Sequence, residues 1–350
     1  MRDQLLGFFF HLCICFHLTA ATESPNVVRA AIDIGMGGPK LQVAEVNPQT
    51  NKIVKMLHTQ RYFVNFYDGI AQNGNNQFSP EIMAQGLQSF KDAVDKANSF
   101  GANGIVAIAT ASFRAAANGD QFADEIRNKT GIQVHIVDQN LEGKLAFQAA
   151  LSKLDVDAEN LVVWDIGGGS MQFISIMPDG TYLVAGQEKG VGAFKDFIIE
   201  NIQHRNIKEI ATPNPMSAED IAHAVNYASR LSEKIDKDLK DKISHPTTIV
   251  IGVGSVFGYG IHVMIGGKNQ FSINDLVPVV HSLPGKTDAD FGGGDYASVE
   301  GSNTVFVLGF MQNLNIDKMH IVNVNIADGA MIYEPFWKVA KGGIDEATHF

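Results

Sequence analysis

Cysteine is almost absent from this sequence. The chain has 350 residues and only two cysteines, Cys13 and Cys15, and both lie in an apolar N-terminal segment. If that segment is removed, the remaining chain has no thiol, so neither disulfides nor a cysteine-ligated zinc ion can hold the fold together. A chain of this length can instead form one large domain or two medium-sized domains that each bury a hydrophobic core.

Positive charge is also scarce. Lysine and arginine number 27 against 38 aspartates and glutamates, which gives a formal net charge of −11. Nucleic-acid binding without sequence preference depends on lysine and arginine, so we predict no nucleic-acid partner. If the ligand is nonetheless a polyanion, backbone amides, a few placed cations and a divalent metal must supply the positive potential.

Several common catalytic motifs are missing as well. The 11 histidines are scattered, without an HExxH motif, which argues against a zinc site. The sequence has neither a Gly-x-Ser-x-Gly nucleophile elbow nor a Gly-Lys-Ser phosphate loop. The chemistry must therefore come from another arrangement of residues.

The N-terminal segment, residues 1–21, has the order of a secretory signal. Arg2 and Asp3 precede an apolar run from Leu5 to Leu18, and the small residues Thr19, Ala20 and Ala21 follow. The run is too short to span a bilayer comfortably. We expect export to a periplasm or to the medium, with no stable membrane insertion after the signal is cleaved. An uncleaved anchor is the alternative.

An internal repeat is the most informative feature. The segment AAIDIGMGGPKLQVAEV from Ala30 resembles LVVWDIGGGSMQFISIM from Leu161, and Asp33 aligns with Asp165. In both copies an apolar strand ends in Asp-Ile-Gly, a glycine-rich turn follows, and the chain returns as a second strand. The repeat predicts two related halves whose glycine-rich hairpins flank one cleft.

Glycine-rich turns of this kind suit phosphate groups. Their consecutive N–H groups form a concave anion site, and hydrated Mg²⁺ prefers a few carboxylates. We predict that Asp33 and Asp165 hold Mg²⁺ while the turns bind adjacent phosphates. The predicted substrate contacts are Gly35, Met36, Gly37, Gly38 and Lys40 in the first turn and Gly167, Gly168, Gly169 and Ser170 in the second. Gly254 and Ser255, in a GVGS turn, are added because this turn resembles a ligand-facing turn of a known superfamily. A solvated lysine and a plain strand-to-helix corner are the alternatives for Lys40 and the GVGS turn.

Apolar periodicity predicts further elements. Ser79 and Pro80 begin an amphipathic helix that Gly101 ends. We also expect a long polar helix over 217–243, a surface loop over 284–302, which is rich in glycine and aspartate, and a closing helix from about Ala330.

Seven motifs occur in a fixed order along the chain. They are FYDGI at 66–70, FSPEIMAQGL at 78–87, ATASFRAAANG at 109–119, TGIQVHIVDQNLEGKLAF at 130–147, WDIGGGS at 164–170, KGVGAFKDF at 189–197 and GVGS at 252–255. In this order and spacing the chain resembles the exopolyphosphatase and guanosine pentaphosphate phosphatase family of the actin-like superfamily, from about Ala30 to its end and more weakly after Lys195. The resemblance implies two actin-like domains, a Mg²⁺-dependent cleft and hydrolysis of a terminal phosphoanhydride.

The resemblance also implies roles for four side chains. Glu142 falls at the family's catalytic base, and Arg114 matches an arginine suited to holding phosphate oxygens. Ser170 would orient the attacking water or the phosphate. Gln172 stands where the family usually has glutamate, whereas secreted nucleoside triphosphate diphosphohydrolases of the same superfamily commonly have glutamine there. Those enzymes usually carry several disulfides, which this chain cannot form after signal cleavage.

The first turn departs from the family pattern. Met36, Gly37 and Gly38 replace the usual hydroxyl or amide side chains. Backbone donors survive this change, but hydroxyl contacts to phosphate are lost, and turnover is expected to fall.

The sequence therefore predicts a two-domain α/β fold of actin-like, ribonuclease H-like domains, each with a mixed five-stranded sheet, around a central cleft. Domain I is expected over 22–141 and domain II over 142–329, with a C-terminal helix at 330–350 packing back onto domain I. The predicted function is Mg²⁺-dependent release of orthophosphate from inorganic polyphosphate. The alternatives are a nucleoside tri- or diphosphate or guanosine pentaphosphate substrate, and a non-catalytic sensor of phosphate ligands. The oligomeric state stays open, with a homodimer as one option.

Overall fold

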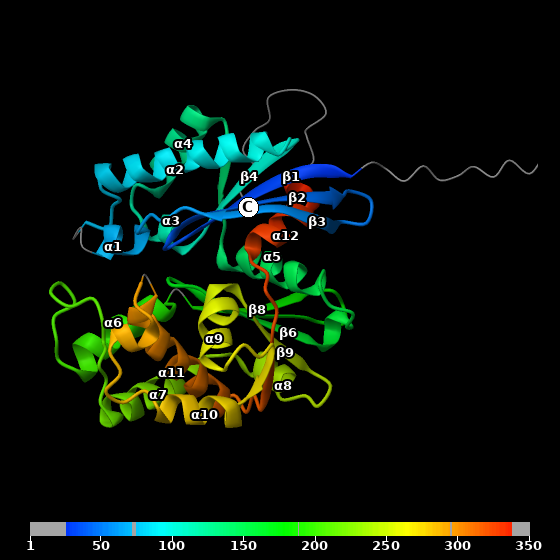
Figure 1. Cartoon of the computed structure of the whole chain (residues 1–350). Helices are drawn as coiled ribbons and strands as arrows, with labels where there is room; N and C mark the ends of the chain where they lie inside the picture. The colour runs from blue at the N-terminus through cyan, green and yellow to red at the C-terminus, as the bar shows by residue number, and fades with distance from the viewer. Residues whose placement is uncertain (1–25, 72–74, 188, 295, 338–350) are drawn as a thin grey trace, which may run out of the picture.

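Two lobes, each built on one β-sheet, make up the part of the chain that the computed structural model describes, residues 26–71, 75–187, 189–294 and 296–337 (Figure 1). The expected signal at 1–21 lies outside these residues. No helix within them is long and apolar enough to cross a bilayer.

The first lobe contains a mixed five-stranded sheet with the order β3-β2-β1-β4-β5. Its strands are Val27–Gly35 (β1), Gly38–Asn47 (β2), Lys52–Arg61 (β3), Gly104–Ala109 (β4) and Gln133–Ile136 (β5). Its helices are Phe66–Ala71 (α1), Pro80–Ser99 (α2), Ala111–Ala115 (α3) and Gly119–Thr130 (α4). The Ser79 side chain accepts a hydrogen bond from the Ile82 N–H and caps α2, which confirms the predicted start of this helix.

The second lobe contains a mixed six-stranded sheet with the order β10-β11-β9-β6-β7-β8. Its strands are Leu161–Ile166 (β6), Met171–Ile176 (β7), Tyr182–Gln187 (β8), Ile249–Val253 (β9), Gln270–Ser272 (β10) and Lys318–Ile321 (β11). Its helices are Val191–Phe197 (α6), Ala218–Ser232 (α7), Lys237–Ile243 (α8), His262–Met264 (α9), Ile273–His281 (α10) and Ala297–Asn313 (α11). Short 3₁₀ or π segments are Ala158–Asn160 (η1), Ile198–Ile202 (η2), Val256–Ile261 (η3), Asp288–Phe291 (η4) and, nearer the C-terminus, Glu334–Phe336 (η5).

The two sheets share one topology. Strands β8-β7-β6-β9-β11 repeat the order of β3-β2-β1-β4-β5, with an antiparallel hairpin followed by parallel neighbours in each half. The internal repeat predicted this relation. The expectation of five strands in both sheets is wrong for the second, because β10 adds an antiparallel edge strand beside β11.

Helices α5 (Gln139–Leu151) and α12 (Ile326–Ile332) lie between the lobes (Figure 1). Helix α5 packs against the second sheet and against α12, and α12 packs on strands β1 and β2 of the first. The chain thus returns to the first lobe, where α12 ends at Ile332. Residues 338–350 lie outside the described part.

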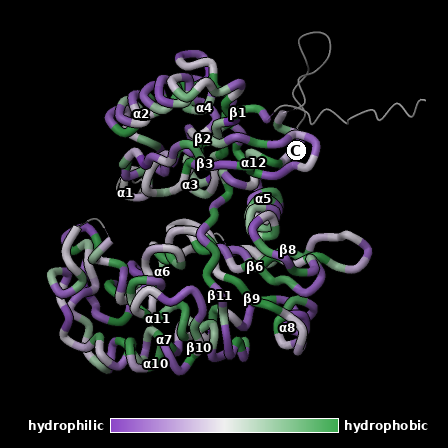
Figure 2. Tube along the Cα trace, turned by 45° about the vertical axis from the view of Figure 1, so that its right-hand side comes forward, coloured by the Kyte–Doolittle hydropathy of each residue, from purple (hydrophilic) through white to green (hydrophobic). Residues whose placement is uncertain are grey.

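Two other expectations need correction. The helix predicted over 217–243 is broken into α7 and α8, because Asp236 caps a new helix start through the Leu239 N–H. The predicted loop over 284–302 contains the short segment η4, and its end belongs to α11. The buried residues of this helix belong to the hydrophobic core of the second lobe, where Figure 2 shows hydrophobic stretches near the labels β6 and β9.

Candidate active site

The two repeated hairpins bring their aspartates to one cavity of about 310 Å³. Asp33, in β1, pairs across its hairpin with Lys40, and Asp165, in β6, pairs across its hairpin with Gln172. Asp33 stands two residues before the end of its strand and Asp165 stands one residue before the end of its strand, so the amide-rich turns follow closely. The cavity wall includes Gly35, Met36, Gly37 and Lys40 from the first hairpin and Gly167, Gly168, Gly169 and Ser170 from the second.

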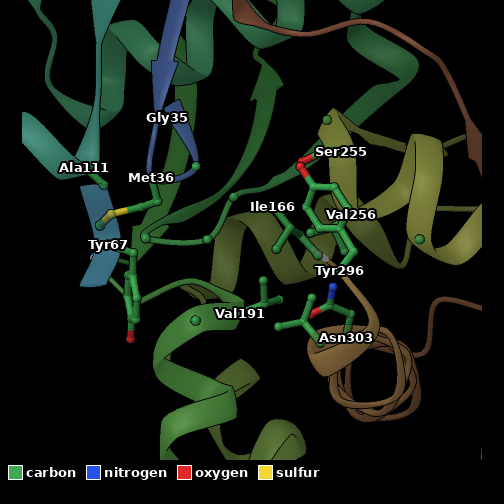
Figure 3. A pocket seen from close by; sticks show the side chains of 18 of the residues that line it. Gly35, Met36, Tyr67, Ala111, Ile166, Val191, Ser255, Val256, Tyr296 and Asn303 are labelled. Carbon is green, nitrogen blue, oxygen red and sulfur yellow. The ribbon is translucent and has the colours of Figure 1, made fainter. Parts of the chain in front are cut away.

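The two glycine-rich turns touch each other through Met36. A Cβ atom at Gly168 would lie 3.3 Å from the Met36 Cβ, and one at Gly169 would lie 2.9 Å from the Cβ of Ala111. In Figure 3 the Met36 side chain extends toward Ala111. The side chain therefore fills part of the space between the turns, where we predict that a phosphate binds.

Negative charge exceeds positive charge around the aspartates. The Lys40 ammonium lies 3.1 Å from a carboxylate oxygen of Asp33, so this lysine points into the cavity. No cation of the described residues forms an ion pair with Asp165. Burial, and then the nearby charges of Glu142 and Asp33, raise the pKa of Asp165 to about 8.

Glu142 lies in the first turn of α5 and is held on both sides. Asp138 caps this helix by accepting from the Leu141 N–H. One carboxylate oxygen of Glu142 lies 2.8 Å from an Arg114 nitrogen, and the other accepts from the Ser170 hydroxyl at 3.2 Å. Burial is the largest influence on the pKa of Glu142 and raises it, although Arg114 opposes this effect. A carboxylate with a raised pKa is suited to accept a proton near neutral pH.

Three of the predicted residues stand behind the cavity wall. Arg114 reaches Glu142 and the Val137 carbonyl, at 2.7 Å from the latter, and Gln172 donates to the Ser170 hydroxyl at 3.3 Å. Gly38 has φ +105°, and a Cβ there would lie 2.6 Å from the Val64 nitrogen. Arg114 thus contacts the predicted base, and the backbone conformation and close packing at position 38 require glycine.

The third turn lies against the second aspartate. Gly254 has φ +82°, and a Cβ there would lie 2.7 Å from a carboxylate oxygen of Asp165. Gly254 and Ser255 both line the cavity. Only glycine lets this backbone approach Asp165 so closely.

Sequence reasoning missed much of the opposite wall. Arg61, Tyr67 and Lys195 line the cavity, as do Tyr296, Glu300 and Asn303 at the start of α11. Tyr67 donates a hydrogen bond to Asp196, which joins α1 to α6 across the lobes. Lys195 lies in the KGVGAFKDF motif, but the sequence analysis gave it no role, and no pattern marked α11 as part of the site.

The residues present fit a divalent cation. The described chain contains no group of three or more potential ligands gathered around one point. Asp33 and Asp165 nevertheless face one cavity, and burial together with the nearby charges of Glu142 and Asp33 raises the pKa of Asp165. Two carboxylates and several waters are the ligand set that Mg²⁺ accepts.

The Met36 side chain gives one testable consequence. Met36→Ser is expected to raise kcat/KM for phosphate release by about tenfold, because it opens space and supplies one hydroxyl donor to a charged oxygen. Met36→Leu keeps the bulk without the hydroxyl and is the control. Equal rates for Met36→Ser and wild type would show that this side chain does not limit phosphate binding.

The paired hairpins and the two related sheets define a two-domain, actin-like fold with carboxylates at the cavity between its halves. Residues 43–209 match the Ppx/GppA phosphatase family. The resemblance found in the sequence is confirmed over these residues.

Individual relatives are more distant. The chain is 28% identical over 152 residues to a bifunctional 3-dehydroquinate synthase/phosphatase of Fusobacterium nucleatum, covering 42% of this chain and 23% of the relative. It is 25% identical over 158 residues to a guanosine-5'-triphosphate,3'-diphosphate pyrophosphatase of Aliivibrio fischeri, covering 45% of this chain and 30% of the relative. The matches thus span less than a third of either relative's length.

A solved structure matches nearly the whole fold. An exopolyphosphatase from Cytophaga hutchinsonii has a TM-score of 0.66 at 16% identity, with 90% of this chain and all of that chain covered. At this identity the match establishes the actin-like fold alone.

Proposed function

We propose that this chain is a Mg²⁺-dependent phosphoanhydride hydrolase that releases terminal orthophosphate from polyphosphate, in the manner of an exopolyphosphatase. One observation carries the proposal. Glu142 is held by Arg114 and Ser170 beside a cavity that Asp33 and Asp165 enter from two glycine-rich hairpins.

The two turns supply the phosphate site. Backbone N–H groups of Gly35 to Gly37 and of Gly167 to Gly169 suit the oxygens of adjacent phosphates, and Lys40 adds a positive charge beside the first turn. Asp33 and Asp165 are the residues that would hold Mg²⁺. When bound, this ion neutralises charge on the phosphate oxygens.

Glu142 acts as the general base. Its carboxylate takes a proton from a water near Ser170, and the water oxygen attacks the terminal phosphorus in line. The bond from this phosphorus to the bridging oxygen breaks, and orthophosphate leaves. Arg114 positions Glu142 through their 2.8 Å contact, and Gln172 orients the Ser170 hydroxyl.

A nucleoside tri- or diphosphate is the second candidate substrate. Gln172 stands at the position where nucleotide hydrolases of the superfamily commonly have glutamine. Of the described residues, the cavity wall presents only three cations, Lys40, Arg61 and Lys195. So few cations suit a short phosphate chain better than a long one.

A substrate panel tests the proposal. Orthophosphate release is measured from long-chain polyphosphate, ATP and GTP with Mg²⁺ and again with excess EDTA. Release that depends on Mg²⁺ supports the hydrolase. Tight calorimetric binding of the same compounds without any release would instead identify a non-catalytic sensor of phosphate ligands.

We also propose that the protein is exported. The proposal rests on the order of charged, apolar and small residues over 1–21. N-terminal sequencing of the protein recovered from cells is expected to find a start near Thr22. A protein that still begins at Met1 would indicate an uncleaved anchor or an unexported chain.

A further inference from the structure

Tyr67 is attached to the first glycine-rich turn. It stands in α1 of the first lobe, is half-buried and lines the cavity. Its backbone N–H donates to the Met36 carbonyl at 3.1 Å. Figure 3 shows its hydroxyl directed away from Met36. The backbone of Tyr67 is therefore tied to the first turn, while its ring extends beyond that turn.

The ring of Tyr67 reaches the segment that supports the second turn. A Cβ atom at Gly192 would lie 2.9 Å from the Tyr67 Cε2 atom and 2.8 Å from the Gly168 carbonyl oxygen. The Gly192 N–H donates to that carbonyl at 2.9 Å, and the Val191 N–H donates to the Gly167 carbonyl at 3.1 Å. The start of α6 therefore packs between the Tyr67 ring and the second turn.

The hydroxyl of Tyr67 completes the connection between the lobes. It donates to one carboxylate oxygen of Asp196, in α6, and the other oxygen lies 3.1 Å from the Lys195 ammonium. The Asp196 side chain is 17% exposed and does not line the cavity. A hydrogen bond to a carboxylate is stronger than one between neutral groups. The Tyr67 side chain therefore holds α6, and with it the second turn, relative to the first turn.

The separation of the two turns matters for a phosphate chain. Adjacent phosphates share one bridging oxygen, so the distance between them is fixed by the chain and not by the protein. Both turns bind one chain only if their separation matches this distance, because each N–H group that misses its oxygen loses a hydrogen bond to a charged acceptor. A single phosphate needs one turn alone. The turns also touch through the side chain of Met36, but methionine is flexible and fixes a distance poorly.

We infer that Tyr67 is a positioning residue that sets the separation of the two glycine-rich turns and thereby favours ligands with two linked phosphates over a single phosphate. It acts through α6, by the packing of its ring on Gly192 and by its hydrogen bond to Asp196. This inference rests on the phosphate sites that the proposed function assigns to the turns, but it does not depend on turnover.

Imidodiphosphate and orthophosphate are the matched probes, because the first has two phosphates joined by a linkage that resists hydrolysis and the second has one. Their binding is measured by calorimetry with Mg²⁺. Tyr67→Phe keeps the ring and removes the hydroxyl. It is expected to weaken imidodiphosphate binding by about tenfold, the effect of one hydrogen bond to a charged group, and to leave orthophosphate binding unchanged. Tyr227→Phe, in α7 and outside the cavity wall, is the control for the chemical change.

Two variants of Asp196 separate the hydrogen bond from the charge. Asp196→Leu and Asp196→Asn both remove the ion pair with Lys195, but only asparagine still offers an oxygen to the Tyr67 hydroxyl. We therefore expect Asp196→Leu to bind imidodiphosphate about tenfold more weakly than Asp196→Asn does. Adding Tyr67→Phe to Asp196→Leu should cause no further loss, because both changes remove the same contact.

Equal weakening of both probes in Tyr67→Phe would overturn the inference, since a direct ligand contact or a general loss of packing acts on a single phosphate as well. Unchanged binding of both probes would also overturn it. A wild type that binds neither probe rejects the inference together with the phosphate sites. If the probes behave as expected but no substrate of the panel releases phosphate, the hydrolase proposal fails and the inference stands.

Discussion

Glu142→Gln is expected to lower kcat for phosphate release by a factor of about 10²–10⁴, the usual contribution of a general base. Glutamine keeps the shape of the side chain, and its oxygen can still accept from Arg114 or Ser170. It cannot take a proton from water at neutral pH. KM is expected to change little, because the phosphate contacts lie on the glycine-rich turns.

The thermal stability of this variant separates chemistry from folding. Burial raises the pKa of Glu142, so its charge is unfavourable in the folded state. We therefore expect a Tm equal to or above that of the wild type. Glu233→Gln, at an exposed position after α7, is the control for the chemical change. Phosphate release from Glu142→Gln at the wild-type rate would remove this residue from the mechanism.

The sequence predicted the frame of the site well. Asp33 and Asp165 stand in matching hairpins of two sheets with the same strand order. Local patterns are sufficient to predict these hairpins, because a glycine-rich turn between two apolar strands is determined by residues close together in the sequence. The capped start of α2 is local in the same way.

Helix α11 could not be predicted because its environment is tertiary. It is buried on all sides, so it lacks the amphipathic period that marks a helix at a surface. The hydroxyls of Ser302 and Thr304 are satisfied within the helix by the carbonyls of Val299 and Glu300. Residue types that suggested a loop therefore lie in a core helix. For this reason the sequence analysis did not assign Asn303 to the site.

Arg114 shows, at a single residue, the same limit of predicting tertiary contacts from sequence. Its type and motif suggested that it binds phosphate, but its guanidinium contacts the Glu142 carboxylate and the Val137 carbonyl. That pairing joins residues that are distant in the sequence. Composition and spacing can suggest that a residue belongs to a site. They do not show whether its side chain contacts the ligand or another side chain of the site.

Without metal, the folded protein is expected to lose stability as the pH rises toward about 8. The pKa of Asp165 is raised from its ordinary 3.8 to about 8 in the folded state. Between these values the folded state keeps a proton that the unfolded state has released, so the free energy of unfolding falls as pH rises. Each pKa unit corresponds to about 1.4 kcal/mol, and the loss is complete above the folded pKa.

Mg²⁺ is expected to reverse this loss, because a divalent cation stabilises the charged form of Asp165 beside Asp33 and Glu142. Tm measured in EDTA from about pH 5.5 to about pH 8.5 should fall in the wild type and change less in Asp165→Asn, which has no proton to lose. Asp95→Asn, at an exposed position in α2, should follow the wild type. Added Mg²⁺ should raise Tm most at the alkaline end, and only when Asp165 is present. An equal Mg²⁺ effect in Asp165→Asn would place the ion elsewhere, because the charge that attracts it to this cavity would then be dispensable.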